Sequence, residues 1–236
     1  MEFTKARSSR VFQEIITQIE DAIVSGELKE GERLPPEREI TDMTGTSRGT
    51  VREALRVLEQ KGLIVIKTGT AGGAFVRPVS PQKVSESLAL LIQTQQVSMK
   101  DLAEFREGVE GIATGLAAKR AQRRDIERLQ GLLQEARMHL DRGDEGWADF
   151  IETDNRIHMA IAEISRNQIY KLVLETVHNN ITLYYDRLLK KDVKVMKINH
   201  QDLQAIIAAV VDKKPGDAQR WAEKHIKKFH RIMEEG

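Results

Sequence analysis

A carboxylate and an imidazole stand one helical turn apart in the segment IETDNRIHMAI, which covers residues 151–161. Asp154 and His158 are separated by four positions, so in a helix both side chains project from the same face. Aspartate oxygens and imidazole nitrogens bind divalent metal ions, and this spacing suits such a site. The chain contains no cysteine, so His, Asp and Glu are the only strong metal ligands that it offers.

The chain has six histidines, and the others are less distinctive than His158. Helical periodicity places His200 at the start of the penultimate helix and His225 midway along the last one. A histidine taken singly is more commonly a surface or hydrogen-bonded residue than a ligand. His178 lies on a long helix, where a role in a pocket and a structural role are both open. We expect His139 and His230 at the surface.

Length and composition are typical of a globular protein. The chain has 236 residues, of which 40% are hydrophobic and 31% charged, which allows one large domain or two modest ones. No apolar run approaches the roughly 18 residues that suggest a membrane span, and the start, MEFTKARSSR, lacks the apolar core of a secretory signal. We therefore expect a cytoplasmic protein without a membrane partner. The formal net charge is +1, so any DNA affinity must come from a local basic patch.

A domain boundary is expected near RPVSP, residues 77–81, where two prolines and a serine form a plausible linker. Before it, the sequence predicts helices followed by a glycine-rich hairpin; after it, only helical periodicity is found. We therefore predict a mainly α protein with one domain at residues 1–78 and an all-α domain at residues 79–236.

Three helices are predicted in the first domain. The first ends near Gly26, where the apolar periodicity stops. The second begins at Pro35 or Pro36, because proline fits the first helical turn, and Gly45 ends it. Ser47 is well placed to cap a third helix that runs to about residue 60. The apolar positions of the first helix are Phe12, Ile15, Ile16, Ile19 and Ile23.

The third helix carries a stripe of basic residues. Arg48, Arg52 and Arg56 recur at every fourth position, displaced from the apolar face of the helix, and such a stripe is often simply solvated. Here two β-rich runs, LIVIK and AFVR, follow the helix and are joined by TGTAGG. A helix-turn-helix followed by a small hairpin is a winged helix, whose third helix enters the major groove. Arginine there bonds guanine edges, whereas Ser47 and Thr50 are better placed for the DNA backbone.

The segment GELKEGERLPPEREITDMTGTSRGTVREALRVLEQKGLI resembles the signature of the GntR family of bacterial transcription regulators. The likeness is carried by LPPER and by SRGTVREAL, and it implies a winged helix-turn-helix that binds operator DNA. In this chain Gly49 stands between two of the motif's polar residues, where it lowers helix propensity and offers no side chain to a base. The residues that the resemblance implies for DNA contact are Arg38, Ser47, Arg48, Thr50, Arg52 and Gly69.

The second domain is predicted to be a bundle of roughly six or seven helices, with a turn at GDEG, residues 143–146. Its last three helices are expected from about Ile169 to Leu189, from about Asn199 to Val211, and from about Asp217 onward. In helical bundles, ligand sites are commonly built in the core from side chains on facing helices.

Segments of this bundle resemble the FCD effector domain of the FadR-like branch of GntR regulators. The family motif has Asp and His four apart, then a His before an apolar run, then an Ala followed seven residues later by a His. The resemblance implies that Asp154, His158, His200 and His225 are metal ligands. The spacing between the last two is lengthened by a KKP insertion that falls in a predicted loop. Arg106, in EFREGVE, corresponds to an arginine near the effector pocket of relatives.

Three imidazoles and one carboxylate suit a borderline divalent ion such as Zn²⁺, Ni²⁺ or Mn²⁺, rather than the oxygen-preferring Ca²⁺. The resemblance implies that a small organic acid binds through this metal. Arg106 is then expected to neutralise the effector carboxylate, and His178 is a second candidate for the effector pocket.

These features together predict a homodimeric regulator that binds a palindromic operator and changes operator affinity when its effector binds. One alternative is an acyl-CoA-responsive or metal-independent regulator of the same family. Another is a metal-dependent enzyme with an appended DNA-binding domain, because a metal with open positions can activate water. The enzyme alternative has little support, since the sequence shows no HExxH motif, no paired carboxylates and no evident general base beside the expected ligands.

Overall fold

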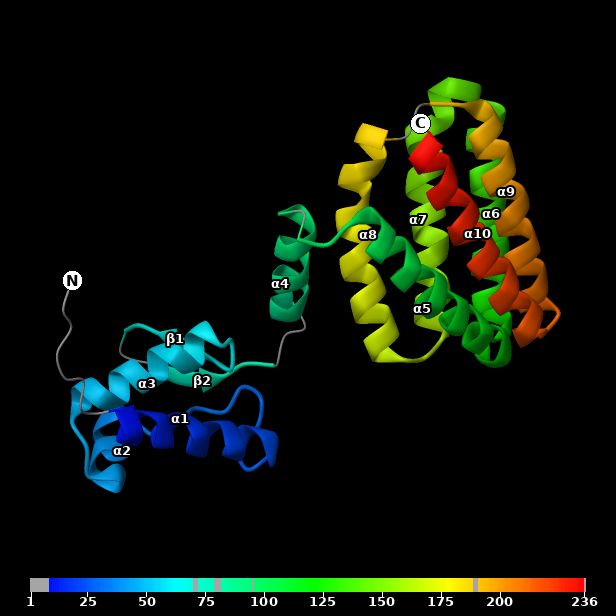
Figure 1. The fold of residues 1–236 in the computed structure, drawn as a ribbon. Coiled ribbons are helices and arrows are strands. Elements are labelled where there is room, and N and C mark those ends of the chain that lie inside the picture. Colours follow the sequence, from blue (N-terminus) through cyan, green and yellow to red (C-terminus); the bar gives the residue numbers. More distant parts are fainter. Residues whose placement is uncertain (1–8, 70–71, 79–81, 95, 189–190, 236) are drawn as a thin grey trace. The chain divides into compact units, whose positions relative to one another are not determined.

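The chain folds into two compact units that divide between Lys83 and Val84, a few residues beyond the predicted boundary. The computed structural model describes residues 9–69, 72–78, 82–94, 96–188 and 191–235 (Figure 1). Most of the predicted linker, residues 79–81, lies outside the described residues. Within the described ranges the fold is mainly α, with ten α-helices and one two-stranded sheet, as predicted.

The first unit is a winged helix-turn-helix, which confirms the predicted architecture. Ser47 caps α3 by accepting a hydrogen bond from the Thr50 amide at 3.2 Å. The second helix begins just after Pro36 rather than at a proline, because Pro36 has an extended ψ of 149° and serves as the N-cap. Gly45 ends that helix with a φ of 63°. The elements are α1 (Ser9–Val24), α2 (Glu37–Thr44), α3 (Arg48–Gln60), β1 (Ile64–Lys67) and β2 (Gly73–Val76).

The wing is anchored to the rest of the first unit by a third extended segment. β1 and β2 pair antiparallel, and residues 32–34 run beside β2, where the Leu34 amide donates to the Ala74 carbonyl at 2.9 Å. Gly73 is required at this crossing, since its φ is +146° and a Cβ would lie 2.7 Å from Arg33 Nε. Residues 70 and 71 of the predicted hairpin turn lie outside the described residues.

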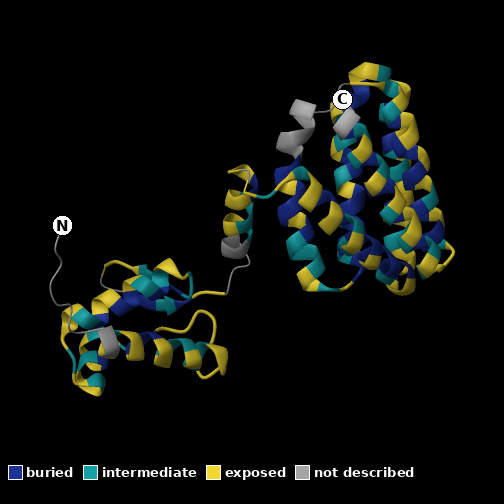
Figure 2. Ribbon diagram, in the orientation of Figure 1, coloured by how far each residue is buried: buried dark blue, intermediate teal, exposed yellow. Residues whose placement is uncertain are grey.

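The second unit is a helical bundle in which α5 packs along α10, α6 packs on α7 and α9, and α7 contacts α5, α6 and α8 (Figure 1). Buried residues line the faces that the helices turn toward one another, and exposed residues cover the outside (Figure 2). The helices are α4 (Gln82–Gln93), α5 (Met99–Arg120), α6 (Arg123–Asp141), α7 (Trp147–Ile164), α8 (Gln168–Leu188), α9 (Val193–Val211) and α10 (Pro215–Glu235).

Two predicted helix starts in this unit are wrong. α9 begins at Val193 instead of near Asn199, because Asp192 caps it by accepting from the Lys194 amide at 2.7 Å. His200 therefore lies inside α9 and does not open it. α10 begins at Pro215, where a proline suits the first helical position, and not at about residue 217. The predicted turn at residues 143–146 is a short 3-10 helix, and residue 189, the predicted end of α8, lies outside the described residues.

Helix α7 is buried on most sides, and this burial brings its polar residues into the interior. Phe150, Ile157 and Ile161 pack in the main core of the bundle, and Asp154 and His158 are only 5% exposed. None of the helices in the described ranges combines the length and apolarity that crossing a membrane would need.

Truncating Phe150 tests this core. Phe150 is fully buried, so Phe150→Ala should lower the free energy of unfolding of the bundle by about 3–5 kcal/mol. Both tryptophans, Trp147 and Trp221, lie in the bundle, so urea denaturation followed by tryptophan fluorescence reports on this unit. Met138→Ala is the control, because Met138 is 56% exposed and its loss should change stability by less than about 0.5 kcal/mol. Equal stability of the two variants would contradict the described core.

Candidate metal centre and nucleic-acid interface

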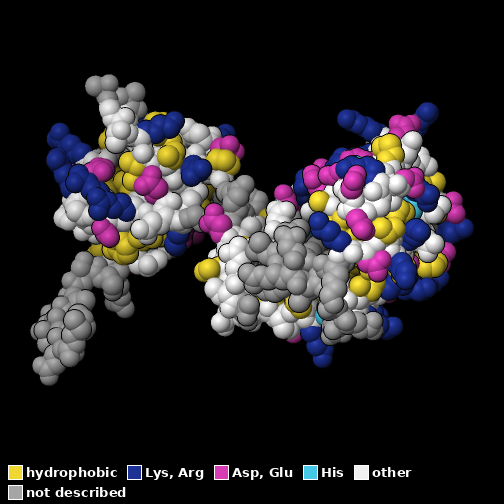
Figure 3. Space-filling view, turned by 90° about the horizontal axis from the view of Figure 1, so that it is seen from above, with side chains coloured by type: hydrophobic (Ala, Val, Ile, Leu, Met, Phe, Trp, Pro, Cys, Tyr) yellow, Lys and Arg dark blue, Asp and Glu magenta, His cyan; other side chains and the backbone are white. Residues whose placement is uncertain are grey.

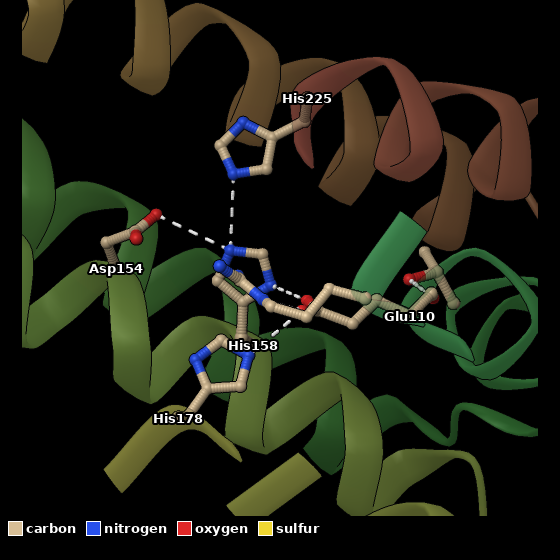
Figure 4. Close-up of polar contacts among 7 residues, drawn as sticks. Glu110, Asp154, His158, His178 and His225 are labelled. Atoms are coloured by element: carbon tan, nitrogen blue, oxygen red, sulfur yellow. Dashed lines mark hydrogen bonds and ion pairs between the residues drawn. The ribbon is translucent and has the colours of Figure 1, made fainter. Parts of the chain in front are cut away.

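Asp154 and His158 of α7 meet His225 of α10 in the interior of the bundle (Figure 4). The Nε2 atoms of His158 and His225 are 3.2 Å apart, and Asp154 Oδ1 lies 3.7 Å from His158 Nε2. All three side chains are at least nine-tenths buried. The structure thus brings together three of the four residues predicted as metal ligands.

The spacing of these three atoms fits one shared divalent cation. Two imidazole nitrogens bound to the same tetrahedral Zn²⁺ at about 2.0–2.1 Å are separated by about 3.3 Å. The observed separation of the two Nε2 atoms is 3.2 Å. Asp154 Oδ1 is buried and has no hydrogen-bond partner in the described part of the chain. A buried carboxylate oxygen without a partner is costly, and a cation between it and the two nitrogens would satisfy it.

Each of the two imidazoles turns its other ring nitrogen toward a carboxylate. His158 Nδ1 lies 2.5 Å from Glu110 Oε2, and His225 Nδ1 lies 3.8 Å from Asp202 Oδ2. Metal-bound histidines in proteins commonly donate their distal N–H to a carboxylate in this way, which fixes the ring and the tautomer. The two Nε2 atoms, and not the two Nδ1 atoms, are therefore the ones free to bind a metal.

Glu110 lies at the centre of a buried charged cluster (Figure 4). Besides its ion pair with His158, its carboxylate accepts hydrogen bonds at Oε1 from Arg106 Nε at 2.5 Å and from His178 Nε2 at 3.0 Å. Burial by itself would raise the pKa of Glu110, but Arg106, His158 and His178 outweigh it and hold that pKa well below its usual value. Glu110 is therefore ionised near neutral pH.

The two histidines beside Glu110 have pKa values that are shifted in opposite directions. Burial would lower the pKa of His158, but the negative charges of Glu110 and Asp154 raise it above its usual value. Burial lowers the pKa of His178 to about 4, so His178 is neutral near pH 7. Glu110 and Arg106 thus carry charge in the cluster, whereas His178 does not.

Glu110, His158 and His178 form a second group with metal-ligand spacing, but its charge disfavours a cation. The Arg106 guanidinium lies 2.5 Å from Glu110 Oε1, where it would repel a divalent ion in the same place. Within the described residues, no lysine or arginine pairs with the carboxylate of Asp154. We therefore consider only the group of Asp154, His158 and His225 as the candidate metal centre.

His200 does not join either group. It lies on the side of α9 that faces α6, close enough to the Leu133 backbone and to the charges of Arg137 and Asp141 for these to affect its pKa, which burial lowers. The residue of α9 that faces His225 is Asp202, whose carboxylate also accepts from Lys228 Nζ at 2.8 Å. The prediction of a four-residue ligand set with His200 is thus not supported by this arrangement.

The structure also gives the positions of the other bundle residues for which the sequence predicts a role or exposure. Arg106 and His178, the candidate effector residues, both contact Glu110, which in turn contacts His158 of the candidate metal centre. His139 and His230 are half-buried and not fully at the surface. The sequence interpretation overlooked Glu110, although its position four residues after Arg106 on a predicted helix is a signal for an ion pair.

The predicted DNA-reading residues lie at one end of α2 and α3 and in the wing. Arg48 is the first residue of α3 and is exposed. The hydroxyls of Ser47 and Thr50 are 2.9 Å apart and bond to each other at the helix cap. Arg38 is exposed in the first turn of α2, and Gly69 in the wing is exposed with a φ of +99°.

Arg52 also has a role inside the protein. Its Nη2 donates to Glu37 Oε2 at 3.0 Å, which ties α3 to α2, although the pair is largely exposed. An exposed pair of this kind contributes little to stability, so Arg52 can exchange Glu37 for another anion at small cost. Lys and Arg side chains gather along one edge of this unit (Figure 3), which supplies the local basic patch that the neutral overall charge cannot.

Comparison with known families and proteins agrees with this architecture. Residues 12–76 match the model of the family described as bacterial regulatory proteins, gntR family, and residues 101–228 match the FCD domain. The Uxu operon transcriptional regulator of Escherichia coli strain K12 is 33% identical over 162 residues, which are 69% of this chain and 61% of that protein. The chain thus spans less than two thirds of that relative's length.

Two further relatives cover nearly the whole chain. The Glc operon transcriptional activator of Escherichia coli strain K12 is 28% identical over 233 residues, 94% of this chain and 90% of that protein. A solved GntR structure from Streptococcus agalactiae superposes with a TM-score of 0.65 at 21% identity, covering 93% of this chain and 99% of the other, which supports the fold. The chain belongs to the GntR family of bacterial transcription regulators, with a winged-helix DNA-binding domain followed by an FCD effector domain.

Proposed function

We propose that this regulator binds a divalent metal through Asp154, His158 and His225, and that a small organic acid bound at this centre controls its affinity for operator DNA. The observation that carries the proposal is the convergence of two Nε2 atoms, 3.2 Å apart, with Asp154 Oδ1, a buried oxygen that has no hydrogen bond within the described residues. Two imidazoles and a carboxylate suit Zn²⁺, Ni²⁺ or Mn²⁺.

Three protein ligands leave coordination positions open to a second molecule. A metal held there supplies Lewis acidity toward an oxygen ligand such as an effector carboxylate or hydroxyl. Arg106, which pairs with Glu110 Oε1, supplies a buried positive charge near this centre. Arg106 and His178 would then help to bind the effector carboxylate, in competition with Glu110.

Effector binding must change the affinity of the protein for DNA. We propose that the regulator acts as a homodimer on a palindromic operator, and that effector binding shifts the placement of the two winged helices. The coupling is reciprocal, so operator DNA must change effector affinity by the same factor. The residues proposed to contact the operator are Arg38, Ser47, Arg48, Thr50, Arg52 and Gly69.

Replacing Arg48 tests the DNA-reading helix. Arg48 is exposed at the start of α3 and, unlike Arg52, pairs with no carboxylate in the described part of the chain. Arg48→Ala should weaken binding to operator DNA by about 5- to 150-fold, as expected for the loss of 1–3 kcal/mol from one base contact. The measurement is fluorescence anisotropy with an operator selected from random DNA by the wild-type protein.

The matched control is Arg124→Ala, which removes another exposed arginine, in α6 of the bundle. This variant should bind the selected operator as the wild type does, and both variants should bind zinc normally. If Arg48→Ala retains full operator affinity, α3 does not read the DNA through this residue.

A pair of histidine variants tests the metal ligands. His225→Ala removes a nitrogen that faces His158, so its zinc affinity should fall by more than the roughly 10- to 100-fold typical of losing an outer partner. His200→Ala removes another buried imidazole, one that faces α6, and its zinc affinity should stay within about twofold of the wild type. Isothermal titration of zinc into chelator-treated full-length protein measures both. Equal losses of zinc affinity in the two variants would show that His200 is also a metal ligand.

A further inference from the structure

We infer that Glu110 is a positioning residue of the metal centre, which holds His158 in the one orientation that directs Nε2 toward Asp154 and His225. This inference rests on the proposed metal function and adds a residue to it. Its physical basis is the 2.5 Å contact between His158 Nδ1 and Glu110 Oε2.

The contact selects between two orientations of the imidazole. Turning the ring by half a turn about the Cβ–Cγ bond exchanges nitrogen atoms with carbon atoms, so Glu110 would then face a C–H group. A carboxylate in the interior favours the orientation that gives it an N–H donor. Glu110 therefore fixes the proton on Nδ1 of a neutral His158, and this leaves the lone pair on Nε2, the atom 3.2 Å from His225.

Glu110 is itself held in place and cannot easily turn away. Arg106 and His178 both donate to its Oε1 atom, at 2.5 Å and 3.0 Å, while Oε2 faces His158. Its side chain is 4% exposed, so water does not compete for these donors. The carboxylate is thus shared between His158, a proposed metal ligand, and the two residues proposed for effector binding. A movement of either effector residue would therefore be transmitted to His158 through Glu110.

Glu110→Gln tests the inference, because glutamine keeps the shape but loses the charge and one acceptor. We expect its zinc affinity to fall by about 10- to 100-fold relative to the wild type, as for other outer partners of metal-bound histidines. Glu107→Gln is the matched control on the same helix, since Glu107 is half-buried and only reaches Lys227 at 3.6 Å. The control should bind zinc as the wild type does. Equal zinc affinity of Glu110→Gln and the wild type overturns the inference.

A measurement on the wild-type protein covers the case in which Glu110→Gln does not fold. Imidazole ¹⁵N chemical shifts of the zinc-loaded protein report which ring nitrogen carries the proton and which binds the metal. We expect His158 to show a protonated Nδ1 and a metal-bound Nε2. A metal-bound Nδ1, or an Nδ1 without a proton, overturns the inference.

Failure of the proposed metal function and failure of the role of Glu110 give different results. If the wild type binds no zinc, the proposed metal function fails and the inference fails with it. If the wild type binds zinc, His225→Ala does not, and Glu110→Gln binds as well as the wild type, the metal function stands and only the role of Glu110 is overturned.

Discussion

The interior of the FCD domain depends on one buried carboxylate. Glu110 is withdrawn from water, and an ionised carboxylate without partners there would cost several kcal/mol of folding free energy. Arg106, His158 and His178 offset this cost, and they come from α5, α7 and α8. The pairing therefore fixes the positions of three helices at once, and breaking it would leave charges unpaired in the core.

The same constraint shapes the candidate metal centre. Because His158 directs Nδ1 at Glu110, only Nε2 is left to meet His225, and Asp154 Oδ1 lies on that side as well, 3.7 Å from Nε2. The neighbouring group around Glu110 has ligand spacing too, but the Arg106 guanidinium already pairs with its carboxylate and would repel a cation there. His158 of the candidate metal centre and Arg106 contact different oxygens of the Glu110 carboxylate. This arrangement suits an organic acid that binds through the metal.

Local signals were sufficient to predict much of the molecule. Ser47 as a cap, the glycines at helix ends and the spacing of Asp154 and His158 all act within a few residues, and the structure has them as expected. His200 was misplaced because α9 is buried on many sides, so periodicity did not show which face meets α10. Positions 200 and 202 point about 200° apart on a helix, which puts Asp202, and not His200, toward His225. Only tertiary packing determines which face of α9 meets α10.

The most direct test of a metal-dependent acid sensor is a thermal-shift screen of the full-length protein against small carboxylates and hydroxy acids. Each acid is tested on chelator-treated protein and on the same protein reloaded with zinc. The account predicts that one or a few acids raise the melting temperature of the zinc-loaded protein and not that of the chelated protein. If chelation leaves the melting temperature unchanged and no acid shifts either form, Asp154, His158 and His225 are structural polar residues and the central claim is wrong.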